Sequence, residues 1–197
     1  LVVLLCVLFI FALIADLALG SVIFSPTELW EAITGNPEVD IQREILLNHR
    51  LPKALTAILT GAGLAISGVL MQTLFNNPLA GPDVLGVTSG ASLGVALLTL
   101  SGVSLPFLNY LSGWGQVTAA IIGATIVLLL VVFVALRVRQ TVSLLIVGLM
   151  IGYFAGAIVS ILQSISNPDT LNLFVTWTFS SLSAVGWGQL HVLAPIL

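Results

Sequence analysis

Charged residues are scarce in this chain. Of its 197 residues, 7% are Asp, Glu, Lys or Arg and 58% are hydrophobic. Soluble domains carry about 25% charged residues, and disordered chains and nucleic-acid-binding proteins depend on charge still more. The composition therefore excludes an ordinary soluble globular protein, a disordered chain and a nucleic-acid binder. We expect the chain to lie mostly in lipid.

Residues that carry enzyme chemistry are equally sparse. Cys6 is the single cysteine, so no disulfide can form within the chain, and His49 and His191 have no Cys or carboxylate neighbours at metal-ligand spacing. The phosphate-binding pattern GxxxxGK[ST] is absent, and no pair of acids, or of Lys and Asp, within the apolar runs indicates a proton relay. The sequence predicts no enzymatic activity, no metal and no cofactor.

Long apolar runs occupy over half of the chain, and each approaches the roughly 20 residues that cross a bilayer as a helix. They predict an all-α, polytopic helical membrane protein: a single transmembrane permease domain with five complete helices and the start of a sixth. Residues 1–20 could instead be a signal peptide, but four more runs follow. Because the chain begins at Leu and ends inside an apolar run, we expect it to be part of a larger protein. The expected spans are residues 1–19, 54–75, 84–103, 115–136, 142–165 and, in part, 190–197.

The connections between the runs alternate in length, so the long ones should share one membrane face. All four tryptophans lie in the long connections, as expected for an aromatic belt at one interface. The Lys and Arg residues divide almost evenly and do not orient the chain. Ser25-Pro26-Thr27-Glu28 predicts the start of a short helix, and residues 170–182 predict an interfacial helix.

Small residues form stripes on three of the expected helices. Such stripes indicate close helix packing, or alternatively a wide, weakly polar passage. A polar glutamine on a lipid-embedded helix should point into the bundle, which applies to Gln72 and Gln163. The remaining members of the stripes are Ala57, Gly61, Ala65 and Gly68, then Gly86, Gly90 and Gly94, and finally Gly148, Gly152, Gly156 and Ser160.

Two connections carry further candidate sites. Residues 76–83 form a short loop with two prolines, and Asp83 either caps the next helix or binds an ion. Arg50 and Lys53 lie at the expected start of the second span, where the helix dipole disfavours cations. With Glu44 as the nearest acid in sequence, these two cations are either interfacial anchors or a docking surface for an acidic partner.

The stretch from Arg50 to Val95 resembles the FecCD family, the permease subunits of ABC importers for iron–siderophore, haem and cobalamin. The matching patterns are RLP[RK] from Arg50, GAxLAxSGxxxQ from Gly61, NPLAxP from Asn77 and LGxxxGA from Leu85. They occur in the family's order and spacing, and the rest of the chain is similar in order. The resemblance covers the N-terminal part of a family member.

This resemblance implies a fragment of a bundle of about ten helices that works as a homodimer in the bacterial cytoplasmic (inner) membrane. Its implied partners are a cytoplasmic ATP-binding subunit, which hydrolyses the ATP, and a periplasmic or lipoprotein substrate-binding protein. The resemblance also directs the long connections outward and the short ones to the cytoplasm. It does not identify the chelate.

The resemblance further implies roles for individual residues. Arg50 and Lys53 would dock the binding protein. Asn77, Pro78 and Leu79 would form one cytoplasmic gate element, and Thr141 and Val142 a second. The residues expected to line the translocation path are Gln72, Gly148, Gly152, Gly156, Ser160 and Gln163.

Two other functions remain open from the residues alone. An ion-coupled secondary transporter would use Asp16 or Asp83 as its ion site, and a membrane scaffold would not transport at all. Uptake that depends on an ATPase and is indifferent to protonophores would separate the ABC importer from the ion-coupled transporter.

Overall fold

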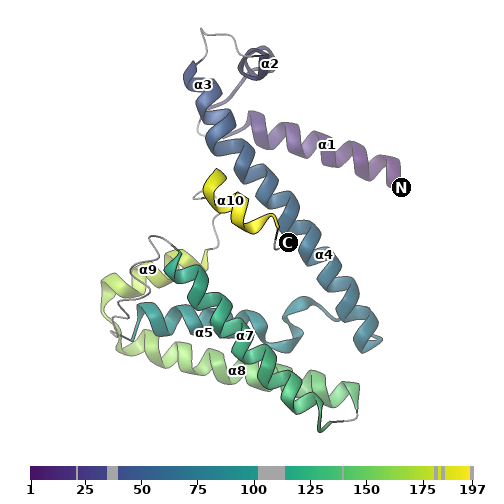
Figure 1. The fold of residues 1–197 in the computed structure, drawn as a ribbon, viewed down its shortest axis with the longest axis vertical. Coiled ribbons are helices and arrows are strands. Elements are labelled where there is room, and N and C mark those ends of the chain that lie inside the picture. Colours follow the sequence, from purple (N-terminus) through teal and green to yellow (C-terminus); the bar gives the residue numbers. More distant parts are fainter. Residues whose placement is uncertain are drawn as a thin grey trace. The chain divides into compact units, whose positions relative to one another are not determined.

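The computed structural model describes residues 1–20, 22–34, 40–101, 114–138, 140–179, 182 and 185–195. Every regular element within these residues is helical, as the composition predicts (Figure 1). The chain divides into two compact units, one formed by Leu1–Leu64 with Ser181–Leu197 and the other by Ala65–Ser180.

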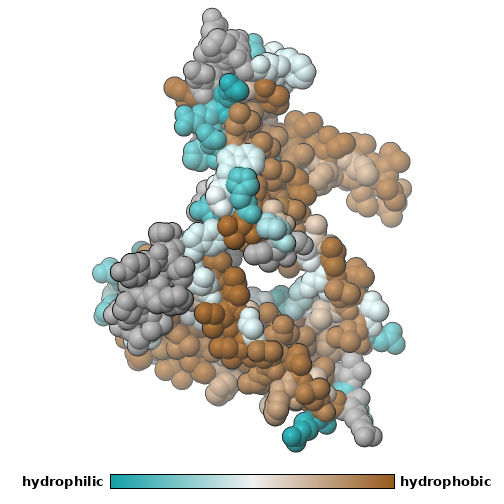
Figure 2. Space-filling view, viewed as in Figure 1, coloured by the Kyte–Doolittle hydropathy of each residue, from teal (hydrophilic) through white to brown (hydrophobic). Residues whose placement is uncertain are grey.

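Three of the described helices are long and apolar enough to cross a membrane, and they correspond to expected spans. They are Ile41–Phe75, Gly115–Ala135 and Val142–Ile165; the shorter apolar helices are Val2–Ala18 and Val87–Thr99. The apolar exterior that lipid requires is visible over α1 in the first unit and over α7 and α8 in the second (Figure 2).

The expected span at residues 84–103 is wrong as a single continuous helix. A 3₁₀ turn, η3 (Pro82–Leu85), comes first, and α5 covers only Val87–Thr99. Gly86 separates the two with a φ of 72°, a left-handed conformation that glycine adopts without steric cost. Residues 102 and 103 lie outside the described residues.

The first unit contains a helical rod that is longer than the sequence predicts. Its parts are α3 (Asp40–Glu44), the π-helix η2 (Ile45–Arg50) and α4 (Leu51–Phe75), which continues into the second unit. At 1.5 Å per residue the 35 residues Ile41–Phe75 reach about 52 Å, whereas the hydrocarbon core is about 30 Å thick. The expected span at 54–75 can therefore cross the core, while the more polar beginning extends beyond it.

This rod corrects the expectation that Arg50 and Lys53 occupy a helix start. Helical structure begins at Asp40, so neither cation meets the unpaired N–H groups of a helix end. The argument that the helix dipole disfavours them is therefore wrong.

Three further helices belong to the first unit: α1 (Val2–Ala18), α2 (Pro26–Thr34) and α10 (Trp187–Leu193). The expected cap of α2 is confirmed, since the Ser25 N–H donates to Glu28 Oε2 at 2.7 Å and the Glu28 N–H donates to Ser25 Oγ at 3.3 Å. The hydrogen bonds from the Ser25 backbone and hydroxyl lower the pKa of Glu28. A small core of Phe24, Ala32 and Leu46 joins α2 to the rod.

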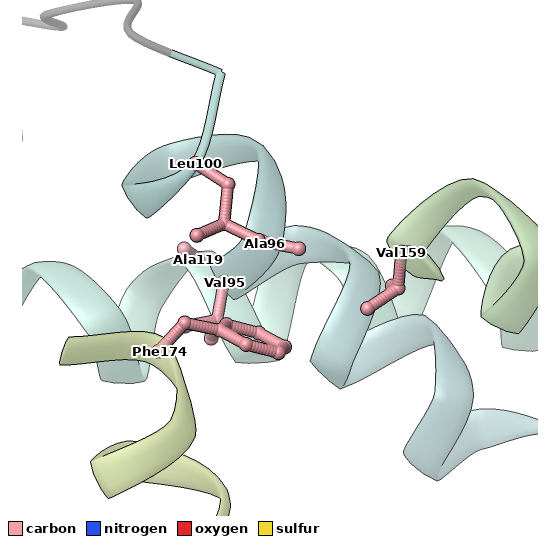
Figure 3. Packing of buried hydrophobic residues seen from close by; sticks show 6 residues of the cluster. All are labelled: Val95, Ala96, Leu100, Ala119, Val159 and Phe174. Carbon is pink, nitrogen blue, oxygen red and sulfur yellow. The ribbon is translucent and has the colours of Figure 1, made fainter. Parts of the chain in front are cut away.

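In the second unit, α5 packs against both α7 (Gly115–Ala135) and α8 (Thr141–Ile165) (Figure 1). The helix α9 (Pro168–Thr178) contributes Phe174, which is 1% exposed, to the core at one end of α5. The sequence predicts a helix at residues 170–182, and the observed helix begins two residues earlier and ends at Thr178. The core residues drawn in Figure 3 are Val95, Ala96, Leu100, Ala119, Val159 and Phe174.

Candidate functional site

The expected gate loop begins with a defined helix end. The Asn76 N–H donates to the Thr73 carbonyl at 3.3 Å, and the Asn77 N–H donates to the Gln72 carbonyl at 3.1 Å. Asn76 has a φ of 47° and is thus left-handed. This is the Schellman arrangement, in which asparagine is a common substitute for glycine because its side chain tolerates the left-handed region.

The same loop exposes the Leu79 side chain. Asn77 Oδ1 accepts the Leu79 N–H at 2.9 Å, and the Asn77 carbonyl accepts the Ala80 N–H at 3.1 Å. Ala80 is 3% exposed and anchors the loop, whereas Leu79 is 89% exposed. The turn therefore presents one large apolar side chain in a fixed direction.

Asp83 ends the loop and interacts with the following helix. Its Oδ1 accepts a hydrogen bond from the Thr88 hydroxyl, in the first turn of α5. Asp83 itself lies in the first turn of η3. The expectation that Asp83 caps the next helix is wrong: Gly81 and Gly86 occupy the N-cap positions of η3 and α5 without side-chain cap hydrogen bonds, and α5 begins four residues after Asp83, at Val87.

The second expected gate element lies at the start of α8. Gln140 precedes the helix in an extended conformation, Thr141 is its first residue, and Val142 is 68% exposed. The Thr141 side chain and Arg139 lie outside the described residues. Gate roles at Thr141 and Val142 remain predictions.

Glycines of α8 pack closely against the turn before α5. A Cβ atom added at Gly148 would lie 2.9 Å from the Leu85 Cα, and one added at Gly152 would lie 3.2 Å from the Gly86 Cα. Both glycines are buried. Their close packing is confirmed, and in this chain they face the Leu85–Gly86 backbone rather than an open passage.

The remaining residues that we expect to line the translocation path are exposed or half-buried in this chain. Residues spaced four apart advance by about 40° around a helix, so the series turns away from the packed face as it proceeds. No atom lies within 4 Å of a Cβ added at Gly156, and Ser160 and Gln72 are exposed. Gln163 is half-buried. The path role of these four residues remains a prediction.

Arg50 is held by the segment that follows α1. Its guanidinium donates to the carbonyls of Leu17 and Val22, and its Cζ lies 4.3 Å from the centre of the Phe24 ring. A Cβ added at Gly20 would lie 2.8 Å from Arg50 Nη2, so glycine leaves room for the guanidinium. The planar group thus fastens the connection between α1 and α2 to the rod.

Lys53 pairs with an acid that is remote in sequence. Its Nζ lies 3.5 Å from Asp16 Oδ1, and the two side chains are 45% and 42% exposed. Asp16 therefore replaces Glu44 as the relevant acid. The sequence shows Asp16 as the one charge in the first apolar run, a signal that a partner is needed, but not which cation provides it.

Comparison with known proteins shows that the chain is similar to a family of transport proteins and to individual permeases. The sequence model of the FecCD transport family matches residues 7–197. The hemin transport system permease protein HmuU of Yersinia pestis is 36% identical over an alignment of 196 residues that covers 96% of this chain and 57% of that protein. The vitamin B12 import system permease protein BtuC of Vibrio cholerae is 33% identical over 190 residues, which are 96% of this chain and 53% of that protein.

A solved structure agrees with this family. It shows an inward-facing conformation of a metal-chelate type ABC transporter, with a TM-score of 0.74 and 31% identity. The match covers 94% of this chain and 55% of that one. The chain therefore spans about half the length of the relatives that it matches.

Proposed function

Because this chain belongs to the FecCD transport family, we propose that it is the N-terminal part of a permease subunit of an ABC importer in the bacterial inner membrane. Its substrate class is a metal chelate, haem or cobalamin. The complete subunit has about ten spans, five of them complete in this chain, and works as a dimer. A cytoplasmic ATP-binding subunit supplies the energy, and a substrate-binding protein delivers the substrate.

The observation that carries this proposal is the loop Asn77–Ala80. It is fixed by the Asn77 side chain and by buried Ala80, yet it exposes 89% of Leu79. A leucine held on a rigid turn presents apolar surface that a second copy of the chain can cover, which is favourable. In a dimer the second copy provides that surface, and two such leucines narrow the exit.

Leu79→Ala in the full-length permease tests the gate. We expect faster leak of substrate from proteoliposomes that lack binding protein, because the narrowing side chain is shortened. Leu74→Ala is the matched control, since Leu74 is also exposed, at 62%, but lies on the regular part of α4. Unchanged leak in Leu79→Ala, together with no crosslinking between two Leu79→Cys copies, would refute the gate.

We also propose that the outward cations meet acids on the binding protein, with Lys53 as the more accessible of the two. Its partner Asp16 is itself half exposed, so a carboxylate on another protein can compete for the ammonium. Lys53→Glu should slow association and flatten its salt dependence. Asp16→Asn should do the opposite, because it releases Lys53. Equal association rates in both variants and in the unmodified protein would refute the docking role and show that Lys53 is only an interfacial anchor.

ATP dependence separates this proposal from ion-coupled transport. The two acids that could bind an ion, Asp16 and Asp83, are engaged with Lys53 and Thr88. Uptake by the assembled transporter should require the ATP-binding subunit and persist in the presence of a protonophore. Uptake abolished by the protonophore at constant ATP would favour the secondary transporter.

A further inference from the structure

An indole N–H reaches a main-chain carbonyl from far along the sequence. Trp187 Nε1 donates to the Leu47 carbonyl at 2.9 Å, across 140 residues. Trp187 is the first residue of α10, and Leu47 lies in the π-helix η2. Both residues belong to the first unit, in which α10 lies beside the rod (Figure 1).

The Leu47 carbonyl needs this donor because of Pro52. In η2 the Leu51 N–H donates to the Leu46 carbonyl, five residues back. By the same π-helical pattern the Leu47 carbonyl would accept from residue 52, but proline has no N–H. Pro52 is also fully buried. A carbonyl left unpaired here would cost free energy, and the indole removes that cost.

We infer that Trp187 is a positioning residue: it supplies the hydrogen bond that Pro52 removes and thereby holds Ile45–Arg50 in the π-helical register. The register matters because a π turn holds one extra residue. Its conversion to an α turn would rotate the preceding residues by about 100° relative to α4. Leu46, which is 3% exposed in the core with Phe24, could not then keep its place.

Contacts at the start of α10 fix the position of the Trp187 indole. Gln189 Oε1 accepts the Gly186 N–H at 3.0 Å, which fixes the first turn of the helix. The ring centres of Trp187 and His191 are 6.1 Å apart. Leu190 is 6% exposed and anchors the same turn.

Hydrogen exchange of the full-length protein tests the inference. Trp187→Phe keeps an aromatic ring but removes the N–H. We expect the amides of residues 45–51 and of Lys53 to exchange about fivefold faster, which corresponds to the loss of one ordinary hydrogen bond. Trp30→Phe is the control, because Trp30 is in the same unit and 69% exposed. No faster exchange than in that control would overturn the inference.

A second background makes the test specific. Pro52→Ala restores an N–H at position 52, which in the π-helical register donates to the Leu47 carbonyl in place of the indole. Trp187→Phe should then cause no further increase in exchange. The same increase in both backgrounds would show that Trp187 acts only by packing.

A spectroscopic measurement covers the case in which Pro52→Ala does not fold. The ultraviolet resonance Raman difference between the unmodified protein and Trp187→Phe isolates this one indole. A band position typical of a hydrogen-bonded indole supports the inference. A band position typical of a free indole overturns it.

Discussion

The contact between α5 and α7 leaves no room for a side chain at Gly123. A Cβ atom there would lie 2.2 Å from the Gly90 carbonyl oxygen and 2.9 Å from the Gly94 nitrogen. These are main-chain atoms of the facing helix, so no rotamer change can relieve the clash. We therefore expect Gly123→Ala to force the two helices apart and to lower the free energy of unfolding.

The magnitude follows from two opposing terms. Carbon and oxygen atoms pack best at about 3.5 Å, so the helices must separate by about 1 Å, and such overpacking costs about 1–3 kcal/mol. Replacing glycine by alanine inside a helix contributes about 1 kcal/mol in the favourable direction. The expected net effect is a loss of about 0–2 kcal/mol.

Gly61→Ala is the matched control. Gly61 lies inside α4 with no atom within 4 Å of its added Cβ, so only the favourable helix term applies. The two variants should therefore differ by about 1–3 kcal/mol. Reversible unfolding by SDS in bicelles, followed by far-ultraviolet circular dichroism, measures both. If Gly123→Ala unfolds at or above the midpoint of Gly61→Ala, the close approach of α5 and α7 does not exist.

Three further predictions concern local structure. Arg50→Lys should lower the free energy of unfolding by about 1–3 kcal/mol in the same SDS assay, because an ammonium cannot keep the forked contact with two carbonyls and the Phe24 ring. The lowered pKa of Glu28 means that its contribution to the stability of α2 is complete above the usual value of 4.5 and is lost as the pH falls through the lower folded value. Exchange of the α2 amides, corrected for intrinsic rates, should therefore accelerate at acid pH in the unmodified protein but not in Glu28→Gln. Asn76→Gly should preserve the end of α4, whereas Asn76→Val should cost about 1–2 kcal/mol because valine resists the left-handed conformation; thermal unfolding of the two variants decides this.

The helical class and the long spans could be predicted because they depend on local properties. The runs expected at 115–136 and 142–165 correspond to helices at Gly115–Ala135 and Thr141–Ile165. A continuous apolar stretch becomes helical in lipid because its backbone groups must pair within the stretch, whichever helices lie beside it. The cap at Ser25 and Glu28 was predictable for the same reason, since it joins residues only three apart.

The contacts that shape the candidate sites are not local, and the sequence indicated them only in part. Asp16 and Lys53 each looked unpaired, and nothing in the chain between them joined them. Pro52 reads as the beginning of a helix, since proline is common in a first turn, yet here it follows a π-helix that began seven residues earlier.

Small-residue stripes show the same limit. Periodicity identifies a face that another backbone can approach, but not the helix that covers it. Gly90 and Gly94 meet α7, and Gly86 meets α8, whereas Gly61 and Gly68 on α4 meet no atom within 4 Å. The sequence analysis does not identify Gly123, which lies in a helix with little polar contrast, although Gly115, Ala119 and Gly123 are spaced four apart.

The geometry of the proposed gate loop, residues 76–83, limits how it can move. It begins at left-handed Asn76 and ends at Asp83 in η3, which left-handed Gly86 follows, and the side chains of Asn77 and Asp83 each accept a hydrogen bond. A side chain at position 86 is disfavoured for two reasons. The φ of Gly86 is positive, and an added Cβ would lie 2.9 Å from the Gly148 carbonyl oxygen. A loop fixed at both ends cannot fold aside on its own. Opening of the proposed gate at Leu79 therefore requires α4 and η3 to carry the loop as a rigid body, so variants that weaken the contact of Gly86 with α8 should change gating even though they leave Leu79 itself intact.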